Sequence, residues 1–195
     1  MITKTDKKIK RIFDLILAIL LIPIIIIPLF VFVIIASVDT KEYGIFSQYR
    51  VGQYGKLFNI FKIRTLKNEP HRLGSLDKSA TSFGKFLRRY KLDELPQLFN
   101  VIKGDMSFVG PRPDIEGFAD VLEGEDRIIL EIKPGVTGPA TIKYKNEEVL
   151  LSQQVDPENY NRTIIWKDKV EINKMYIKNW SFYLDLKYII QSITN

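Results

Sequence analysis

The strongest pattern in the chain is a run of apolar residues over 12–38, in which Asp14 is the only charged side chain. As a straight helix these 27 residues would extend about 40 Å, enough to cross a bilayer core of about 30 Å. Residues 1–11 are rich in lysine, and such a basic flank predicts a cytoplasmic N-terminus. Because the run is about twice as long as the apolar core of a signal peptide, we expect a membrane segment that is retained.

Pro23 and Pro28 interrupt this segment and predict a kink, because each proline removes a backbone hydrogen bond and clashes with the preceding turn. Two arrangements remain open. The helix either crosses the bilayer with a kink, or breaks, enters one leaflet and turns back so that both ends stay in the cytoplasm. The two differ in the side of the membrane on which Asp39 and the rest of the chain lie.

Beyond residue 40 the pattern changes to short segments rich in aromatic and β-branched residues. Residues 45–51 and 57–64 predict two strands of a hairpin around a glycine-containing loop. Lys62 and Arg64 alternate with apolar residues, so they share one face of the second strand. Residues 67–82 predict a mobile polar loop, and a helix capped by Thr81 or Ser82 follows over 83–90.

Two adjacent acids, Asp93 and Glu94, precede an apolar run with helical spacing over 95–102, which places them at the start of a helix. Pro96 suits a first helical turn. A helix N-terminus carries partial positive charge, so acids there stay ionised and a phosphate can dock. The pair is either an ordinary cap or a site for phosphoryl chemistry, in which one acid attacks phosphorus, the other holds a divalent metal and arginines neutralise the phosphate.

The rest of the chain predicts further helices and two stiff loops. Arg112 lies between Pro111 and Pro113, which either preorganise its guanidinium for an anion or form a solvated turn. Gly135 and Gly138 allow close approach to a ligand or make a turn. Amphipathic helices are expected over 114–133, broken at Gly124, over 158–178 from a start at Asp156, and from Trp180 onward, where aromatic residues beside lysines suit either the membrane interface or the protein core.

These elements together predict an α+β, mostly helical fold with a membrane helix over 1–39 and a compact domain over 40–195. The net charge of +6 is compatible with nucleic acid, anionic lipid or an anionic small substrate as partner. The absence of cysteine excludes disulfides and thiolate metal sites, and a single histidine, His71, argues against a histidine-based triad or zinc site. Acid–base chemistry must then rely on Asp, Glu, Lys, Arg or Tyr.

The stretch over 92–113, LDELPQLFNVIKGDMSFVGPRP, closely resembles the signature of the bacterial sugar transferases, the monotopic phosphoglycosyl transferases. The likeness extends over nearly the whole chain through KRIFDLILA, RVGQYGKLFNIFKIRTL, KPGVTG and NWSFYLDLK. That family moves a sugar phosphate from a nucleotide sugar, usually a UDP-sugar, to undecaprenyl phosphate and releases UMP. The resemblance implies that Asp93 is the nucleophile, forming a covalent phosphosugar intermediate, and that Glu94 ligates Mg²⁺.

The resemblance also implies roles for basic residues and a place in the cell. Arg88 and Arg112 would bind phosphate or the uridine end, Pro111 and Pro113 would shape the loop, and Lys62 and Arg64 would be secondary phosphate-binding candidates. The re-entrant arrangement is favoured, with the helix in the inner leaflet of the bacterial cytoplasmic membrane and the catalytic domain in the cytoplasm. No nucleic acid partner is expected, and a homodimer is left open.

The chain departs from the family pattern at residues 114–117 and again at 139–146, where many members carry Trp and then Asn-Gly-Arg. These regions are expected to touch the sugar, so the identity of the sugar does not carry over. Lys145 could replace the missing arginine, although an ammonium and a guanidinium are not equivalent. Two other functions stay open: a membrane-tethered basic scaffold for anionic lipid or nucleic acid, and a phosphatase-like hydrolase that uses Asp93.

Overall fold

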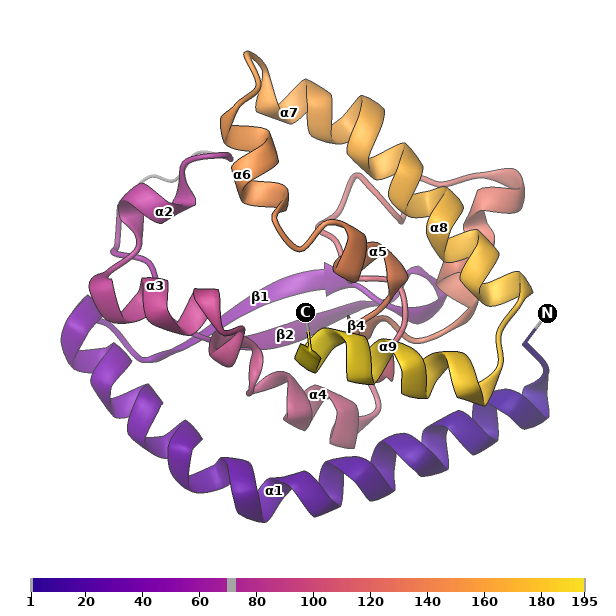
Figure 1. The fold of residues 1–195 in the computed structure, drawn as a ribbon, viewed down its shortest axis with the longest axis horizontal. Helices are drawn as coiled ribbons and strands as arrows, with labels where there is room; N and C mark the ends of the chain where they lie inside the picture. Colours follow the sequence, from indigo (N-terminus) through magenta and orange to yellow (C-terminus); the bar gives the residue numbers. More distant parts are fainter. Residues whose placement is uncertain (1, 70–72, 195) are drawn as a thin grey trace.

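The computed structural model describes residues 2–69 and 73–194, so His71 and its predicted loop position lie outside the described residues. The first element, α1, is a single helix over Lys4–Thr40 that begins with a capping box between Thr3 and Asp6. It contains Pro23 and Pro28 and bends near its middle (Figure 1). The expected break therefore takes the form of a bend in a continuous helix.

Helix α1 is long and apolar enough to cross a membrane, with a mean hydropathy of 3.3 over its most apolar window. Only 11% of that window is buried. Both arms of the helix nevertheless contact the same body of the protein. The Asp14 carboxylate accepts the N–H of Phe108 at 3.1 Å, and the Ser37 hydroxyl accepts the N–H of Gly44 at 2.8 Å. The two arms thus run along one side of the domain (Figure 1).

The predicted hairpin is present as two antiparallel strands, β1 (Ile45–Val51) and β2 (Leu57–Ile63), joined through a 3₁₀ turn. A second, parallel pair consists of β3 (Ser107–Val109) and β4 (Gly135–Thr137). Helix α4 (Gln97–Lys103) packs between α1 and β2. The apolar core at this junction consists of Ala18, Phe58, Ile60, Leu98, Val101 and Met106.

Two sequence predictions differ from the structure in detail. The expected polar loop contains a short helix, α2 (Leu76–Ser79), before α3 (Ser82–Arg89), which Thr81 caps by accepting the N–H of Gly84. The prediction of amphipathic α-helices over 114–133 was wrong. The segment forms turns and a 3₁₀ helix over 124–131. Gly117 and Gly124 have φ values of 87° and 55°, and such left-handed residues interrupt an α-helix.

The last part of the chain is helical and folds back over the hairpin and α1 (Figure 1). It consists of α5 (Pro139–Lys143), α6 (Glu147–Ser152), α7 (Pro157–Tyr160), a π-helical turn over 161–165, α8 (Trp166–Lys178) and α9 (Phe182–Thr194). Asp156 caps α7, as predicted, by accepting the N–H of Asn159. Helix α9 packs on the domain through the buried Asp185 and leaves a mostly apolar face exposed, with Tyr183, Ile190 and Ile193.

Candidate active site

The acid pair lies one turn earlier than its sequence pattern predicts. Asp93 and Glu94 belong to a 3₁₀ turn over Leu92–Glu94, and α4 begins only at Gln97. The placement of the acids in the first turn of that helix was therefore wrong, because Pro96 occupies the N-cap and separates the two elements. The charge that acts on the acids comes from basic side chains instead of from the helix terminus.

A buried asparagine fixes this turn relative to the hairpin. Asn100 of α4 is fully buried and bonds to the backbone of β2 in both directions. Its Oδ1 accepts the N–H of Phe61 at 3.2 Å, and its Nδ2 donates to the carbonyl of Asn59 at 2.7 Å. Since α4 cannot slide along β2 without breaking both bonds, the acid pair stays in register with Lys62 on that strand.

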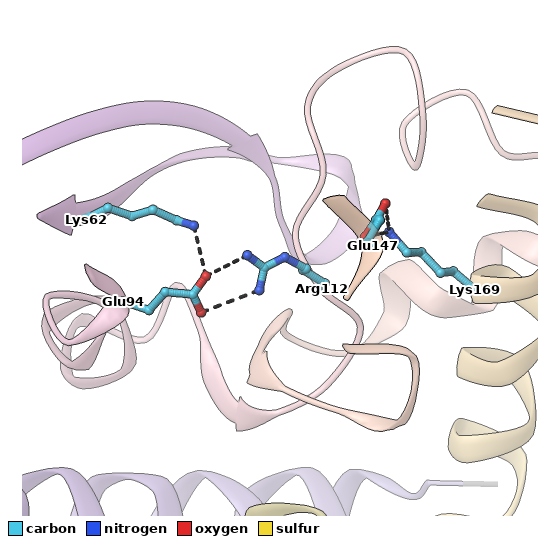
Figure 2. A network of polar contacts seen from close by, with 5 residues as sticks. All are labelled: Lys62, Glu94, Arg112, Glu147 and Lys169. Carbon is cyan, nitrogen blue, oxygen red and sulfur yellow. Dashed lines mark hydrogen bonds and ion pairs between the residues drawn. The ribbon is translucent and has the colours of Figure 1, made fainter. Parts of the chain in front are cut away.

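Glu94 is the centre of a buried ionic cluster formed by three separate segments (Figure 2). Lys62 Nζ lies 2.9 Å and Arg112 Nη2 lies 2.6 Å from Glu94 Oε1. Burial by itself would raise the pKa of Glu94, but the charges and hydrogen bonds of Arg112 and Lys62 hold that pKa well below its usual range. Glu94 is therefore an anion at physiological pH.

Asp93 differs from its neighbour in having an unused oxygen. The residue is 6% exposed, and its buried Oδ1 accepts no hydrogen bond from any residue that the structure describes. Burial raises the pKa of Asp93, while the positive charges of Lys62, Arg88 and Lys91 oppose that rise. A buried carboxylate oxygen without a partner is energetically unfavourable, which makes it a candidate for direct contact with a substrate.

Arg112 reaches Glu94 from a loop that backbone contacts hold in place. Pro111 and Pro113 are both buried, and the Pro111 carbonyl accepts the N–H of Gly135 at 2.8 Å. A Cβ added to Gly135 would lie 2.1 Å from the nitrogen of Gly110. The close approach that glycine permits here is thus between two stretches of backbone, and it keeps the guanidinium in a constant position.

A cavity of about 1000 Å³ opens beside this cluster. Arg112 and Lys91 line it, and Glu94 lies behind this wall because it pairs with Arg112. Neither Asp93 nor Glu94 lines the cavity itself. The predicted binding residue Lys145 lines the same cavity. The volume is at the upper end of what small-molecule sites enclose, and it is adequate for a nucleotide sugar.

The predicted binding residue Arg64 lies outside the ionic cluster around Glu94, and the structure adds cavity residues that were not predicted. Arg64 donates to the carbonyl of Tyr43 at 2.9 Å and covers the ring of Phe46. Gln48 and Arg50 line the cavity but were missed by the sequence reasoning. Their alternation along β1, on the face that Lys62 shares across the hairpin, was a signal that could have found them.

The carboxylates can be tested for their fit to a divalent metal. Within residues 2–69 and 73–194, no group of three or more His, Cys, Asp or Glu side chains is close enough to hold an ion. Mg²⁺, however, commonly binds through one or two carboxylates together with substrate phosphates and water. Glu94 is the carboxylate that would supply a ligand, with a diphosphate supplying others, and its oxygens already accept from Lys62 and Arg112.

The site and the apolar helix together suit an enzyme that handles phosphorylated substrates at a membrane. The family model described as bacterial sugar transferase matches residues 5–195. The chain therefore belongs to the bacterial sugar transferase family.

Individual relatives agree with this assignment. The chain is 34% identical to the sugar transferase EpsL of Bacillus subtilis, over 94% of this chain and 85% of that protein. It is 35% identical to a UDP-glucose:undecaprenyl-phosphate glucose-1-phosphate transferase of Klebsiella pneumoniae and 29% identical to an undecaprenyl-phosphate galactose phosphotransferase of Salmonella typhimurium. The matches cover 94% and 97% of this chain but only 39% and 40% of those longer relatives.

Proposed function

We propose that this protein transfers a sugar 1-phosphate from a UDP-sugar to undecaprenyl phosphate, giving undecaprenyl-diphospho-sugar and UMP. The observation that carries the proposal is the unpartnered buried oxygen of Asp93 beside the Lys62–Glu94–Arg112 cluster. The names of relatives support the substrate class, since the Klebsiella protein is a transferase of glucose 1-phosphate from UDP-glucose to undecaprenyl phosphate. Such a reaction would be the first membrane step in assembling a surface polysaccharide or glycoconjugate.

The proposed reaction has two steps at one phosphorus atom. First, an Asp93 carboxylate oxygen attacks the sugar-bearing phosphorus, and the bond to the bridging oxygen breaks so that its electron pair leaves with UMP. Second, a phosphate oxygen of undecaprenyl phosphate attacks the same phosphorus, and the bond to Asp93 breaks to restore the carboxylate. The covalent intermediate allows a soluble donor and a lipid acceptor to use the same site in turn.

The neighbouring cations supply the electrostatic part of the mechanism. Arg112 is held in position before substrate arrives and would neutralise charge on the phosphate oxygens, assisted by Arg88 and Lys62. Glu94 would hold Mg²⁺, which when bound would neutralise the diphosphate and polarise its phosphoryl oxygens. Lys145 lines the cavity where the donor would lie. Arg64 has no role in this proposal because it contacts Tyr43 and Phe46 instead.

The same proposal places α1 in the inner leaflet of the cytoplasmic membrane as a re-entrant helix. Its support is that Asp14 near one end and Ser37 near the other both bond to the same domain.

The chain contains no cysteine, so single cysteines at Lys4 and Glu42 can report topology by labelling with a membrane-impermeant thiol reagent. We expect neither position to react in intact spheroplasts and both to react after lysis. Reaction of Glu42→Cys in intact spheroplasts would show that the helix spans the bilayer.

The enzymatic test measures UMP release from a panel of UDP-sugars with undecaprenyl phosphate and Mg²⁺. Wild type should release UMP with at least one sugar, and Asp93→Asn should lose that activity. The exposed Glu123→Gln is the matched control and should behave as wild type. Mass spectrometry after donor is added without acceptor should find a sugar-phosphate adduct on Asp93.

The same assay separates the alternative functions. A phosphatase-like hydrolase would continue to turn over when undecaprenyl phosphate is omitted, whereas a transferase stops after one turnover. A membrane-tethered scaffold would show no turnover with any UDP-sugar and would tolerate Asp93→Asn in its binding of lipid or nucleic acid.

A further inference from the structure

The cavity continues past Arg112 into a second polar region between α6 and α8. There Lys169 Nζ lies 2.8 Å from both carboxylate oxygens of Glu147, and Lys169 is only 7% exposed. Figure 2 shows this pair on the opposite side of Arg112 from Glu94. Asp114, which follows the Pro-Arg-Pro loop, lines the same region. The cavity thus has one end next to the acid pair and another that carries two carboxylates of its own.

Two buried polar atoms at this second end have no partner in the described part of the chain. They are Oδ1 of Asn173, in α8, and Oγ1 of Thr141, in α5. Both residues line the cavity, and Asn173 is only 3% exposed. Because nearly all buried polar atoms in proteins are hydrogen-bonded, two such exceptions on facing elements of one cavity point to a ligand that supplies the missing bonds.

The chemistry of this end selects among the parts of a nucleotide sugar. A phosphate is disfavoured because an ionised phosphate has no hydrogen to donate to Asn173 Oδ1. Uracil offers a single N–H donor on its ring edge, whereas a hexose carries several hydroxyl groups that both donate and accept. One sugar ring could therefore donate to Asn173 Oδ1, pair with Thr141 and also meet the Glu147–Lys169 pair. The aromatic side chains of Trp166 and Phe118, which line the cavity, provide the apolar wall that a sugar ring also requires.

We propose that this end of the cavity is the sugar-selecting pocket, and that Asn173 and Thr141 determine which UDP-sugar is accepted. The proposal rests on the proposed function and adds the residues that set its specificity. It also accounts for the departure from the family pattern at 139–146, because α5 and the residues after it, including Tyr144 and Lys145, line the cavity. A pocket that hydrogen-bonds a sugar hydroxyl rejects a sugar lacking it, since the buried partner is then left unpaired.

The test compares binding of the preferred UDP-sugar with binding of UMP by titration calorimetry on the full chain in detergent micelles, with Asp93→Asn in every sample so that the donor binds without reacting. Asn173→Ala and Thr141→Val should weaken binding of the UDP-sugar by about 10- to 100-fold and leave UMP binding within about twofold of wild type. The matched control is Met175→Ala, an exposed residue of α8 outside the cavity. Thr141→Val preserves side-chain shape, so it keeps the test valid if Asn173→Ala does not fold.

The outcomes separate this inference from the proposed function. If either variant weakens UMP binding as much as UDP-sugar binding, the pocket holds the nucleotide and the inference is overturned. If wild type releases UMP while both variants retain its ratio of rates across the sugar panel, the inference fails and the proposed function stands. If wild type binds no UDP-sugar and releases no UMP, the proposed function fails and the inference falls with it.

Discussion

Two buried carboxylates in this protein each pair with a lysine, but their surroundings differ. The first carboxylate belongs to a cluster that we call the terminal clamp, formed by Lys10, Tyr176, Trp180 and Asp185. There Asp185 Oδ2 lies 2.5 Å from Lys10 Nζ. The other oxygen of Asp185 accepts from the Tyr176 hydroxyl and the Trp180 indole. In the acid cluster, formed by Lys62, Asp93, Glu94 and Arg112, Glu94 pairs with Lys62 and Arg112. A buried oxygen of the adjacent Asp93 accepts no hydrogen bond from any described residue.

The difference concerns hydrogen bonding: the carboxylate of Asp185 is fully bonded, whereas that of Asp93 is not. Every oxygen of Asp185 has a donor, so the terminal clamp gains stability from its complete set of bonds. Asp93 is also buried but incompletely bonded, and the fold tolerates the cost because other contacts hold the turn in place. We therefore expect substitutions in the acid cluster to affect activity and those in the clamp to affect stability.

The largest effect is expected for Asp93→Asn, which should lower the rate of UMP release by about 10⁴-fold or more because the proposed nucleophile is lost. Its free energy of unfolding should change by less than about 1 kcal/mol, because Oδ1 has no bond to lose. Steady-state kinetics and urea unfolding in the same micelles measure the two quantities. A large loss of stability would show that Asp93 is a structural residue like Asp185.

The reverse result is expected for Asp185→Asn, which removes the carboxylate that pairs with the buried Lys10. We expect a loss of about 3–5 kcal/mol in the free energy of unfolding. Molecules that remain folded should keep a normal kcat. Lys143→Ala, which breaks an exposed ion pair with Asp168, is the control and should change stability by less than about 1 kcal/mol. Equal effects from the two substitutions would contradict the role given to the clamp.

Arg112→Lys tests whether geometry or charge matters in the acid cluster. A lysine keeps the positive charge but cannot reproduce the planar fork that meets Glu94, so we expect kcat/KM to fall about 100-fold. Stability should change little, since Lys62 still pairs with Glu94. A variant with full activity would indicate that a positive charge at this position is sufficient.

The smallest effect concerns pH. Because burial raises the pKa of Asp93, this residue keeps its proton to a higher pH than an exposed aspartate, and kcat/KM should fall tenfold per pH unit below that raised pKa. Because the folded state holds this proton more tightly than the unfolded state, protonated Asp93 stabilises the fold at low pH. That stabilisation is lost as pH rises through the raised pKa of Asp93. Glu94 has the opposite sign: its lowered pKa means that its pairing persists until much lower pH. An acidic limb at the ordinary pKa of aspartate would contradict the burial of Asp93.

The sequence predicts local features of this protein better than long-range ones. The hairpin and the Thr81 and Asp156 caps follow from nearest neighbours in sequence. The cavity does not, because Glu147 of α6 meets Lys169 of α8 only in the folded chain. Arg64 was misplaced for a related reason: strand alternation gives its face correctly, but β2 ends at Ile63 and the side chain turns toward Phe46.

The bond between Lys10 and Asp185 joins residues that lie 175 positions apart. At about 5–20 residues per second, a ribosome takes roughly 9 to 35 s to synthesise the intervening chain. During that time the apolar helix has already emerged and can partition into lipid, whereas Lys10 cannot yet pair with Asp185. Insertion should therefore precede completion of the tertiary structure, and the nascent chain has to depend on the bilayer or on chaperones until α9 arrives.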